Sequence, residues 1–328
     1  MKRIVVTAPQ LTDIVARELD GCEIIGGDTP METGDHAMTR EELAEQIVEA
    51  DALLSSLSDP LDADMLARAT KLEVIGQCAA GFNNIDVDAA RDRGIVVTTT
   101  PGVLHETTAD LAFGLMLMVT RRLGEAERYV RAKQPWHYDH TFMLGMGLQG
   151  ATLGIIGLGQ IGEAMARRAA AFGMDVVYTA RHDKDASAID ATNPSTAPTR
   201  RVELDELLRT SDVVSVHCPL TEQTRHIIDA GALAAMKSTA YLVNTARGAC
   251  VDEKALVTAL RNGEIAGAGL DVYENEPDIE PELYDMDNVV LLPHIGSAAR
   301  RTREKMTELA ARNIAAMLGG KDALTPVG

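Results

Sequence analysis

Three polar residues in the second half of the chain each follow an apolar run, and their chemistries complement one another. Arg247 lies in NTARG, Glu276 in DVYENEP and His294 in LLPHIG. A histidine can donate a proton near neutral pH, and a neighbouring carboxylate stabilises the imidazolium. An arginine can bind a substrate carboxylate and polarise the adjacent carbonyl. Each residue alone is compatible with a structural role, but together they predict a catalytic set for reduction of a 2-oxo acid.

The elements around these residues alternate between β-branched runs and helical patterns, which predicts α/β architecture with parallel sheets. We expect two doubly wound domains with a cleft between them, a flavodoxin-like substrate domain and a Rossmann cofactor domain. The substrate (lid) domain would comprise residues 1–100 plus 297–328, and the dinucleotide-binding domain residues 101–296. In open α/β sheets ligands bind beyond the carboxyl ends of strands, so the three polar residues should converge there.

A glycine-rich turn in the second domain predicts a nucleotide site. The turn GLGQIG follows the apolar run LGII and opens an alanine-rich helical segment. The first glycine permits the tight turn, the second lets a pyrophosphate approach the backbone, and the third allows close helix–sheet packing. The helix N-terminus offers N–H groups to phosphates. The predicted cofactor contacts here are Gly157, Leu158, Gly159, Gln160, Ile161 and Gly162.

The acid expected at the end of the next strand is missing. A dinucleotide site for NAD carries an Asp or Glu there, which accepts the ribose 2′-OH, but this chain reads YTARHDK. Ala180 removes the repulsion that an acid would exert on a 2′-phosphate, and Arg181 can pair with that phosphate. The pattern favours NADPH. In the alternative, Arg181 is solvated and Asp183 serves the ribose of NADH.

Composition and charge exclude several classes of partner. The chain has 328 residues, 46% of them apolar, and a formal net charge of −18. This balance argues against nucleic acid and anionic membranes as partners. The four cysteines show no metal-ligand spacing, which predicts no metal site and reduced thiols in a cytoplasmic protein. The most apolar long stretch, 111–120, is too short to span a membrane.

The chain between the two alternating regions reads as one long helical segment from about His105 to Lys133, then an irregular loop over 135–150. A final helix from about Arg300 to Leu318 should pack back on the first domain. The loop carries aromatic residues, and loops on α/β scaffolds often carry function.

The motifs GLGQIG, HCPLT, NTARG, LDVYENEP and LLPHIGSA, in this order, resemble the D-isomer-specific 2-hydroxyacid dehydrogenases over essentially the whole chain. FMLG before the cofactor domain and YTAR are more similar to the glyoxylate/hydroxypyruvate reductase subgroup. The resemblance implies an NADPH-preferring reductase of a small anionic 2-oxo acid, with NADH as the alternative cofactor, and a homodimer.

The resemblance also implies residue roles. His294 would be the acid/base, Glu276 its partner and Arg247 the substrate-binding arginine. The backbone at Ala80 and Gly81 would hold the substrate carboxylate, and Trp136 or Tyr138 of a partner chain would close the site. Further cofactor contacts would be Thr108, Cys218, Pro219, Thr224, Ala246 and Asp271, with Asp271 near the carboxamide.

Some features depart from the family or leave alternatives open. Asn83 stands where the family's substrate loop commonly has an Asp. An NADH-dependent dehydrogenase of another D-2-hydroxy acid fits the same motifs. A non-catalytic nucleotide sensor on the same fold is disfavoured, because a sensor has no need to keep Arg247, Glu276 and His294 together.

Overall fold

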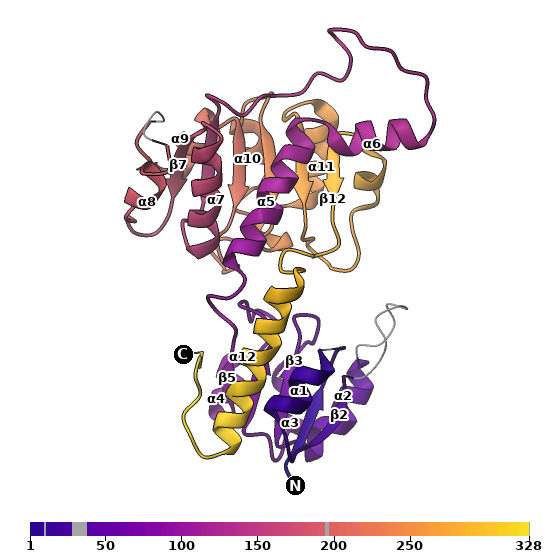
Figure 1. The fold of residues 1–328 in the computed structure, drawn as a ribbon, viewed down its shortest axis with the longest axis vertical. Helices are drawn as coiled ribbons and strands as arrows, with labels where there is room; N and C mark the ends of the chain where they lie inside the picture. The colour runs from indigo at the N-terminus through magenta and orange to yellow at the C-terminus, as the bar shows by residue number, and fades with distance from the viewer. Residues whose placement is uncertain (10, 28–37, 194–196, 328) are drawn as a thin grey trace. The chain divides into compact units, whose positions relative to one another are not determined.

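The computed structural model describes residues 1–328 except 10, 28–37, 194–196 and 328. The chain divides into two compact units, 1–104 with 298–328, and 105–297 (Figure 1). Both are parallel α/β units, as the alternating pattern predicts. In the part of the chain described, no helix combines the length and apolarity needed to cross a membrane.

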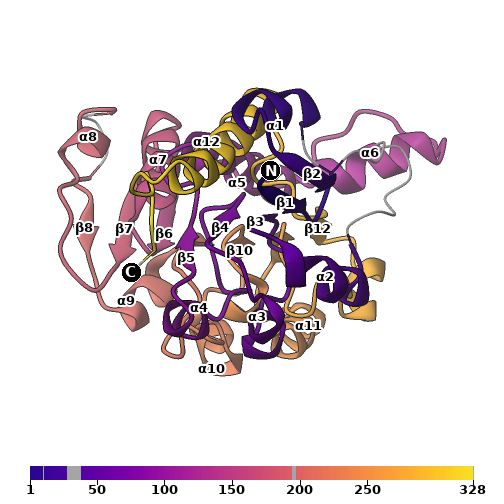
Figure 2. The ribbon, with the colours of Figure 1, turned by 90° about the horizontal axis from the view of Figure 1, so that it is seen from below.

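The first unit contains a five-stranded parallel sheet in the order β2-β1-β3-β4-β5, which is flavodoxin-like. Figure 2 shows helices on both of its faces. Apolar side chains of α2, α3 and α4 cover one face, and those of α1 and the terminal helix α12 cover the other. The elements are β1 (Arg3–Val6), α1 (Thr12–Glu18), β2 (Glu23–Gly26), α2 (Arg40–Gln46), η1 (Ile47–Glu49), β3 (Ala52–Ser55), α3 (Ala63–Arg68), β4 (Val74–Gln77), α4 (Val87–Asp92), β5 (Val96–Thr98) and α12 (Arg300–Leu318).

The second unit contains a seven-stranded parallel sheet in the order β12-β11-β10-β9-β6-β7-β8. The strand order reverses between β6 and β9, which is the switch point of a Rossmann fold. The elements are α5 (His105–Thr120), α6 (Leu123–Arg131), β6 (Thr152–Ile156), α7 (Gln160–Ala171), β7 (Asp175–Thr179), α8 (Ser187–Asp190), β8 (Arg200–Arg201), α9 (Leu204–Thr210), β9 (Val213–Val216), α10 (Ala230–Ala235), β10 (Tyr241–Asn244), η2 (Gly248–Cys250), α11 (Glu253–Asn262), β11 (Gly267–Leu270), η3 (Pro281–Asp285) and β12 (Val289–Leu291).

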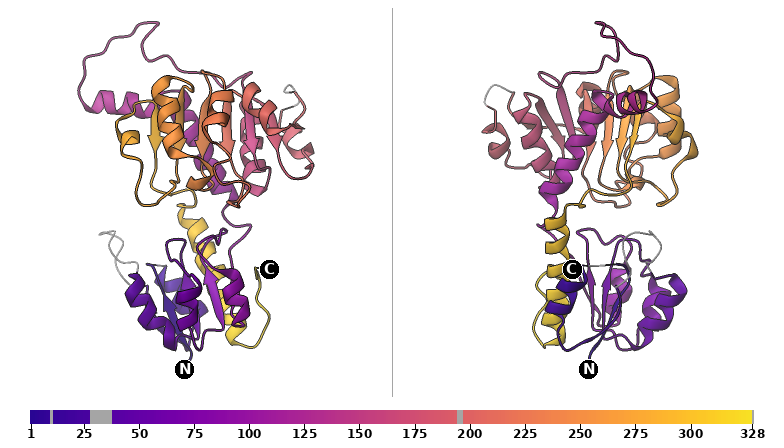
Figure 3. Two further views of the ribbon diagram at one scale, coloured as in Figure 1. Left: turned by 180° about the vertical axis from the view of Figure 1, so that it is seen from behind. Right: turned by 45° about the vertical axis from the view of Figure 1, so that its right-hand side comes forward.

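The core of the second unit has two halves, one on each face of this sheet. Helices α5 and α7 pack on one face, and α9, α10 and α11 pack on the other (Figure 3). The strands are buried on both faces, so they read as continuous apolar runs rather than alternating ones. The carboxyl ends of β6, β9, β10, β11 and β12 all meet one edge of the sheet.

The long helical segment expected from His105 to Lys133 is broken in the structure. Helix α5 ends at Thr120 and α6 begins at Leu123, because Arg122 adopts a left-handed conformation with φ 54°. The Thr120 carbonyl accepts a hydrogen bond from the N–H of Met146 at 2.8 Å, and Arg122 pairs with Glu125 at 2.8 and 2.7 Å. Contacts with the returning loop therefore set this helix end.

Candidate active site

The glycine turn joins β6 to α7 as its motif predicts. Gly157 has φ 98°, and a methyl group there would lie 2.7 Å from the backbone nitrogen of Cys218. Gly159 is the exposed N-cap of α7, has no side-chain cap, and has open space where a methyl group would point. Leu158 is buried beneath the turn. The N-terminus of α7 thus presents backbone N–H groups that can bind the phosphates of a dinucleotide.

The end of β7 lies directly beside this turn. The N–H of Gly157 donates to the Thr179 carbonyl at 2.9 Å, so Ala180 and Arg181 follow at the rim of the nucleotide turn. Arg181 is exposed. No carboxylate occupies position 180, where the side chain would face a ribose 2′-oxygen.

The other predicted cofactor contacts lie beyond the carboxyl ends of β9 and β10. Cys218 is buried and Pro219 exposed. The Thr224 hydroxyl donates to the Pro219 carbonyl at 2.6 Å and accepts from the N–H of Thr221 at 2.7 Å, which closes this loop on itself. Ala246 follows β10 and is partly buried.

His294 and Glu276 meet in a hydrogen-bonded pair. The His294 Nδ1 atom lies 2.6 Å from Glu276 Oε2, and the side chains are 33% and 35% exposed, so both reach solvent. Burial raises the pKa of Glu276, but the hydrogen bond and charge of His294, with the N–H of Tyr273 and the charge of Arg247, outweigh it. They leave the pKa of Glu276 below its usual value. The carboxylate therefore stays ionised at neutral pH and can accept a hydrogen bond from Nδ1 of His294.

Asp271 holds the loop that carries His294. Its carboxylate accepts the N–H groups of Ile295 and Gly296 at 2.8 and 2.7 Å. His294 itself has φ 52°, a conformation that costs free energy for a residue with a side chain and is often kept at functional sites. A methyl group on Gly296 would lie 3.3 Å from Thr108 Cγ2, so the start of α5 approaches the same loop. Thr108 and Asp271 thus both border the His294 loop.

Burial raises the pKa of Asp271, and the N–H of Ile295, the charge of His294 and the N–H of Gly296 oppose the rise. These same N–H donors fix the carboxylate, which in turn fixes the backbone next to the predicted acid. Asp271 therefore has a structural task at the site in addition to the carboxamide contact that the resemblance implies.

Arg247 follows β10, and the side chain of Asn244 fixes the backbone at this position. The buried Asn244 side chain accepts from the N–H of Ala246 at 3.0 Å and donates to the Arg247 carbonyl at 2.9 Å. Burial lowers the pKa of Arg247, and the charge of Glu276 opposes this change. An arginine keeps its proton despite such a shift. Arg247 therefore brings a half-buried cation to the edge that also carries Glu276 and His294.

A second His–Glu pair joins these loops and was not predicted from the sequence. His226 Nε2 lies 2.6 Å from Glu274 Oε1, and the N–H of His226 donates to the Ala249 carbonyl at 2.8 Å. A methyl group on Gly248 would overlap the Tyr273 backbone, so the loops that carry Arg247 and Glu276 touch main chain to main chain. His226 has φ 50° and binds both loops. The sequence feature that could have indicated this pair is Glu274 in YEN, two residues before Glu276.

Ala80 and Gly81 lie in the first unit, in the loop after β4. The Gln77 amide donates to the Gly81 carbonyl at 3.4 Å and to Asn84 Oδ1 at 2.9 Å. Asn84 in turn donates to the Ser56 carbonyl at 3.0 Å. Ala80 is exposed, and the loop is held from within the unit, so its main chain is accessible in a defined conformation.

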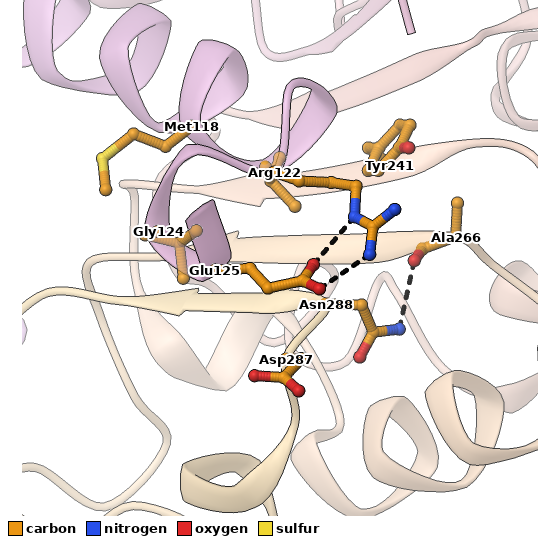
Figure 4. A pocket seen from close by; sticks show the side chains of 10 residues that line it. Met118, Arg122, Gly124, Glu125, Tyr241, Ala266, Asp287 and Asn288 are labelled. Carbon is orange, nitrogen blue, oxygen red and sulfur yellow. Dashed lines mark hydrogen bonds and ion pairs between the residues drawn. The ribbon is translucent and has the colours of Figure 1, made fainter. Parts of the chain in front are cut away.

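Trp136 and Tyr138 lie in the long loop after α6, at the opposite edge of the sheet from the His294 pair. The start of α6 adjoins the first residue of β10 and residues that precede β11 and β12, where a cavity of about 460 Å³ lies. Figure 4 shows the Arg122–Glu125 pair among the residues that line this cavity, and Figure 1 shows the loop leaving from that end of the unit. Trp136 is 65% and Tyr138 81% exposed. The structure therefore does not bring these two aromatics to the catalytic set of the same chain.

The Rossmann sheet, the glycine turn and the His–Glu pair define an oxidoreductase that uses a nicotinamide dinucleotide. The model of the D-isomer specific 2-hydroxyacid dehydrogenase NAD-binding domain matches residues 113–296. The chain belongs to this family, within its glyoxylate reductase subgroup.

Named relatives agree with this assignment. The chain is 46% identical to a glyoxylate reductase of Thermococcus litoralis over 291 residues, which is 87% of this chain and 86% of the relative. A crystal structure of the TT0316 protein of Thermus thermophilus has TM-score 0.89 and 42% identity, with 99% of this chain and 100% of that one covered. An NADPH-dependent glyoxylate/hydroxypyruvate reductase of Sinorhizobium meliloti, solved with NADP and malonate, has TM-score 0.83 and 36% identity, with 100% and 97% covered.

Proposed function

We propose that the protein is an NADPH-preferring reductase that converts glyoxylate or hydroxypyruvate to the 2-hydroxy acid. The observation that carries this proposal is the His294–Glu276 pair, which lies at the same sheet edge as Arg247 and the glycine turn. The relatives named glyoxylate reductase support the choice of substrate. Reduction of a 2-oxo acid requires a proton donor, a group that binds the substrate carboxylate and a hydride source.

The residues present fit a nicotinamide dinucleotide. The open space at Gly159, the left-handed Gly157 and the uncapped start of α7 suit a pyrophosphate, which Gly159, Gln160 and Ile161 would bind through their backbone. Asp271 and Thr108 would border the nicotinamide end. When bound, the reduced dinucleotide supplies a hydride.

The chain itself supplies the proton and the substrate contacts. Nδ1 of His294 is bonded to Glu276, so Nε2 would donate the proton to the substrate carbonyl oxygen. Ionised Glu276 would favour the protonated ring before transfer. Arg247 would bind the 2-oxo acid through its carboxylate and polarise the carbonyl. The backbone N–H groups at Ala80 and Gly81 would add contacts to that carboxylate.

The preference for NADPH rests on the turn after β7. Ala180 leaves no carboxylate to accept a ribose 2′-OH, and exposed Arg181 can pair with a 2′-phosphate. The name of the S. meliloti relative supports the same cofactor. The alternative acid, Asp183, already pairs with Arg201 at 3.3 Å, which makes it a weaker ribose acceptor.

The proposed enzyme is a homodimer. Apolar side chains gather on α6 and the loop after it, with Leu123, Val130, Trp136, Phe142 and Leu144 all exposed, and a second copy of this chain would cover them. Such a homodimer would let Trp136 or Tyr138 close the partner's site.

The four free thiols fit a reducing compartment, so we place the enzyme in the cytoplasm. The first unit would then be the substrate domain and the second the cofactor domain.

Initial rates test the proposal directly. Wild type and Arg181→Asp would be assayed with glyoxylate and hydroxypyruvate, each with NADPH and NADH. We expect turnover with NADPH to exceed that with NADH in the wild type and the preference to disappear in Arg181→Asp. Equal use of both cofactors by the wild type would contradict the cofactor assignment. Absence of turnover with either substrate would contradict the substrate assignment.

A further inference from the structure

A short edge strand holds an arginine against the turn after β7. Strand β8 pairs in parallel with β7, with Arg201 opposite Tyr178, and the N–H of Val202 donates to the Tyr178 carbonyl at 2.8 Å. Arg201 Nε donates to the Ala180 carbonyl at 2.9 Å, and its Nη1 lies 3.3 Å from Asp183 Oδ1. The guanidinium therefore contacts both the first residue of the turn and its one carboxylate.

The same turn is closed from its other side. The Tyr178 hydroxyl accepts the N–H of Lys184 at 2.9 Å and donates to the Lys184 carbonyl at 3.3 Å. The turn 180–184 is thereby fixed between β7 and β8, next to the glycine turn that Thr179 touches. Arg181, Lys184 and Arg201 bring three cations to this corner, against the two carboxylates of Asp183 and Asp185, in a chain of net charge −18. A basic corner at this point of a Rossmann fold is suited to an anion on the adenosine ribose.

Asp183 is the group that would oppose such an anion. A carboxylate near the ribose repels a 2′-phosphate and favours NADH. Arg201 offsets this charge by pairing with Asp183. Because the Asp183 side chain is 84% exposed and that of Arg201 37%, the pair is weak and leaves the guanidinium accessible to a second anion. The contacts in the structure use Nε and Nη1, and a guanidinium has further N–H donors with which to bind a phosphate.

We propose that Arg201 is a second arginine of the 2′-phosphate site, which binds the phosphate of NADPH beside Arg181 while it continues to offset the charge of Asp183. This inference rests on the proposed preference for NADPH and adds a residue from a strand outside the glycine unit. The guanidinium would then contact two oxyanions, Asp183 through Nη1 and the phosphate through its remaining N–H groups.

Binding measurements test Arg201 without depending on turnover. Dissociation constants of NADP⁺ and NAD⁺ would be measured by calorimetry for wild type, Arg201→Ala and the matched control Arg200→Ala. Arg200 neighbours Arg201 on β8, points to the other face of the strand and pairs with Glu206 at 2.8 Å. Adenosine 2′,5′-bisphosphate and AMP would serve as probes that lack the nicotinamide half.

We expect Arg201→Ala to weaken NADP⁺ and the bisphosphate about tenfold, with NAD⁺ and AMP nearly unchanged. Arg200→Ala should bind all four as the wild type does. Removal of the opposing charge in Arg201→Ala/Asp183→Asn should recover part of the lost NADP⁺ affinity, because the repulsion is then absent.

The outcomes separate this inference from the proposed function. Equal weakening of NADP⁺ and NAD⁺ in Arg201→Ala would mean that Arg201 only shapes the turn, which would overturn the inference. If Arg181→Asp removes the preference and Arg201→Ala leaves it intact, the inference fails and the cofactor proposal stands. If the wild type binds NADP⁺ and NAD⁺ equally, both fail.

Discussion

At the scale of single residues, Arg247 has a fixed backbone, and the role proposed for it is one that a lysine would not fill. Its backbone is fixed by Asn244, and its guanidinium is half-buried near the Glu276 charge. A planar guanidinium can bind a carboxylate with two parallel hydrogen bonds, whereas an ammonium acts as a point charge. The residue type, and not only its charge, therefore matters at this position.

We expect Arg247→Lys to raise KM for glyoxylate by about tenfold or more and to lower kcat less, because the lost contacts are those proposed to bind the substrate carboxylate. Steady-state kinetics at fixed NADPH would measure both. Arg261→Lys, an exposed arginine of the same unit that lies 3.9 Å from Glu282, is the matched control and should leave KM unchanged. An unchanged KM in Arg247→Lys would contradict the proposal that Arg247 binds the substrate carboxylate.

At the scale of elements, three loops of the second unit are bound to one another by the His226–Glu274 pair. His226 follows the Thr224 loop, its backbone contacts Ala249, and its side chain contacts the residue two before Glu276. The N–H of Glu274 also donates to the buried carboxylate of Glu253. These contacts relate the loop that carries Arg247 to the loop that carries Glu276.

His226→Ala should therefore lower kcat by about tenfold through displacement of Glu276, with a smaller change in KM for NADPH. The alkaline limb of its pH–rate profile should also move to lower pH, as removal of Glu276 would cause, which a general loss of stability would not do. His226→Gln, which can keep a hydrogen bond to Glu274, should restore most of the rate. A profile identical in shape to that of the wild type would show that the pair has no part in placing Glu276.

Much of the element order follows from the sequence, because parallel strands buried on both faces produce long apolar runs between helical patterns. The His294–Glu276 pair and the glycine turn also follow from residue types placed after strands. The break at Arg122 does not, because it depends on the contact between Thr120 and Met146 across the loop. Strand β8 has only two residues, and its importance comes from the Arg201 contacts rather than from any periodic pattern.

At the scale of the whole molecule, the loop with Trp136 and Tyr138 lies at the edge of the sheet opposite the proposed catalytic residues of its own chain. If either aromatic closes an active site, that site belongs to a partner chain. The exposed apolar residues along α6 and the loop agree with a covered surface in the assembly. The proposed homodimer therefore makes each site dependent on both chains.

A mixed-dimer experiment would test this dependence. Trp136→Ala and Tyr138→Ala chains would be assayed first, and the slower variant mixed with His294→Asn chains under conditions that exchange subunits. We expect the mixture to exceed the sum of the two separate activities, because the intact loop of one chain closes the intact site of the other. As a control, the loop variant that also carries His294→Asn would be mixed with His294→Asn chains. This mixture should show no gain in activity. Activity equal to the sum would indicate that the loop acts within its own chain or not at all.

The proposal that His294 is the proton donor is tested most directly by the pH dependence of kcat/KM for hydroxypyruvate reduction in wild type, Glu276→Gln and His294→Asn. We expect the wild-type rate to fall at alkaline pH, when the imidazole loses its proton, and Glu276→Gln to move this limb to lower pH because the ring loses its carboxylate. His294→Asn should remove the limb and lower kcat by about 10²–10⁴-fold. Asp278→Asn, in the same loop as Glu276, should leave the profile unchanged. A limb that stays at the wild-type pH in Glu276→Gln, or that persists in His294→Asn, would contradict the assignment of His294 as the proton donor.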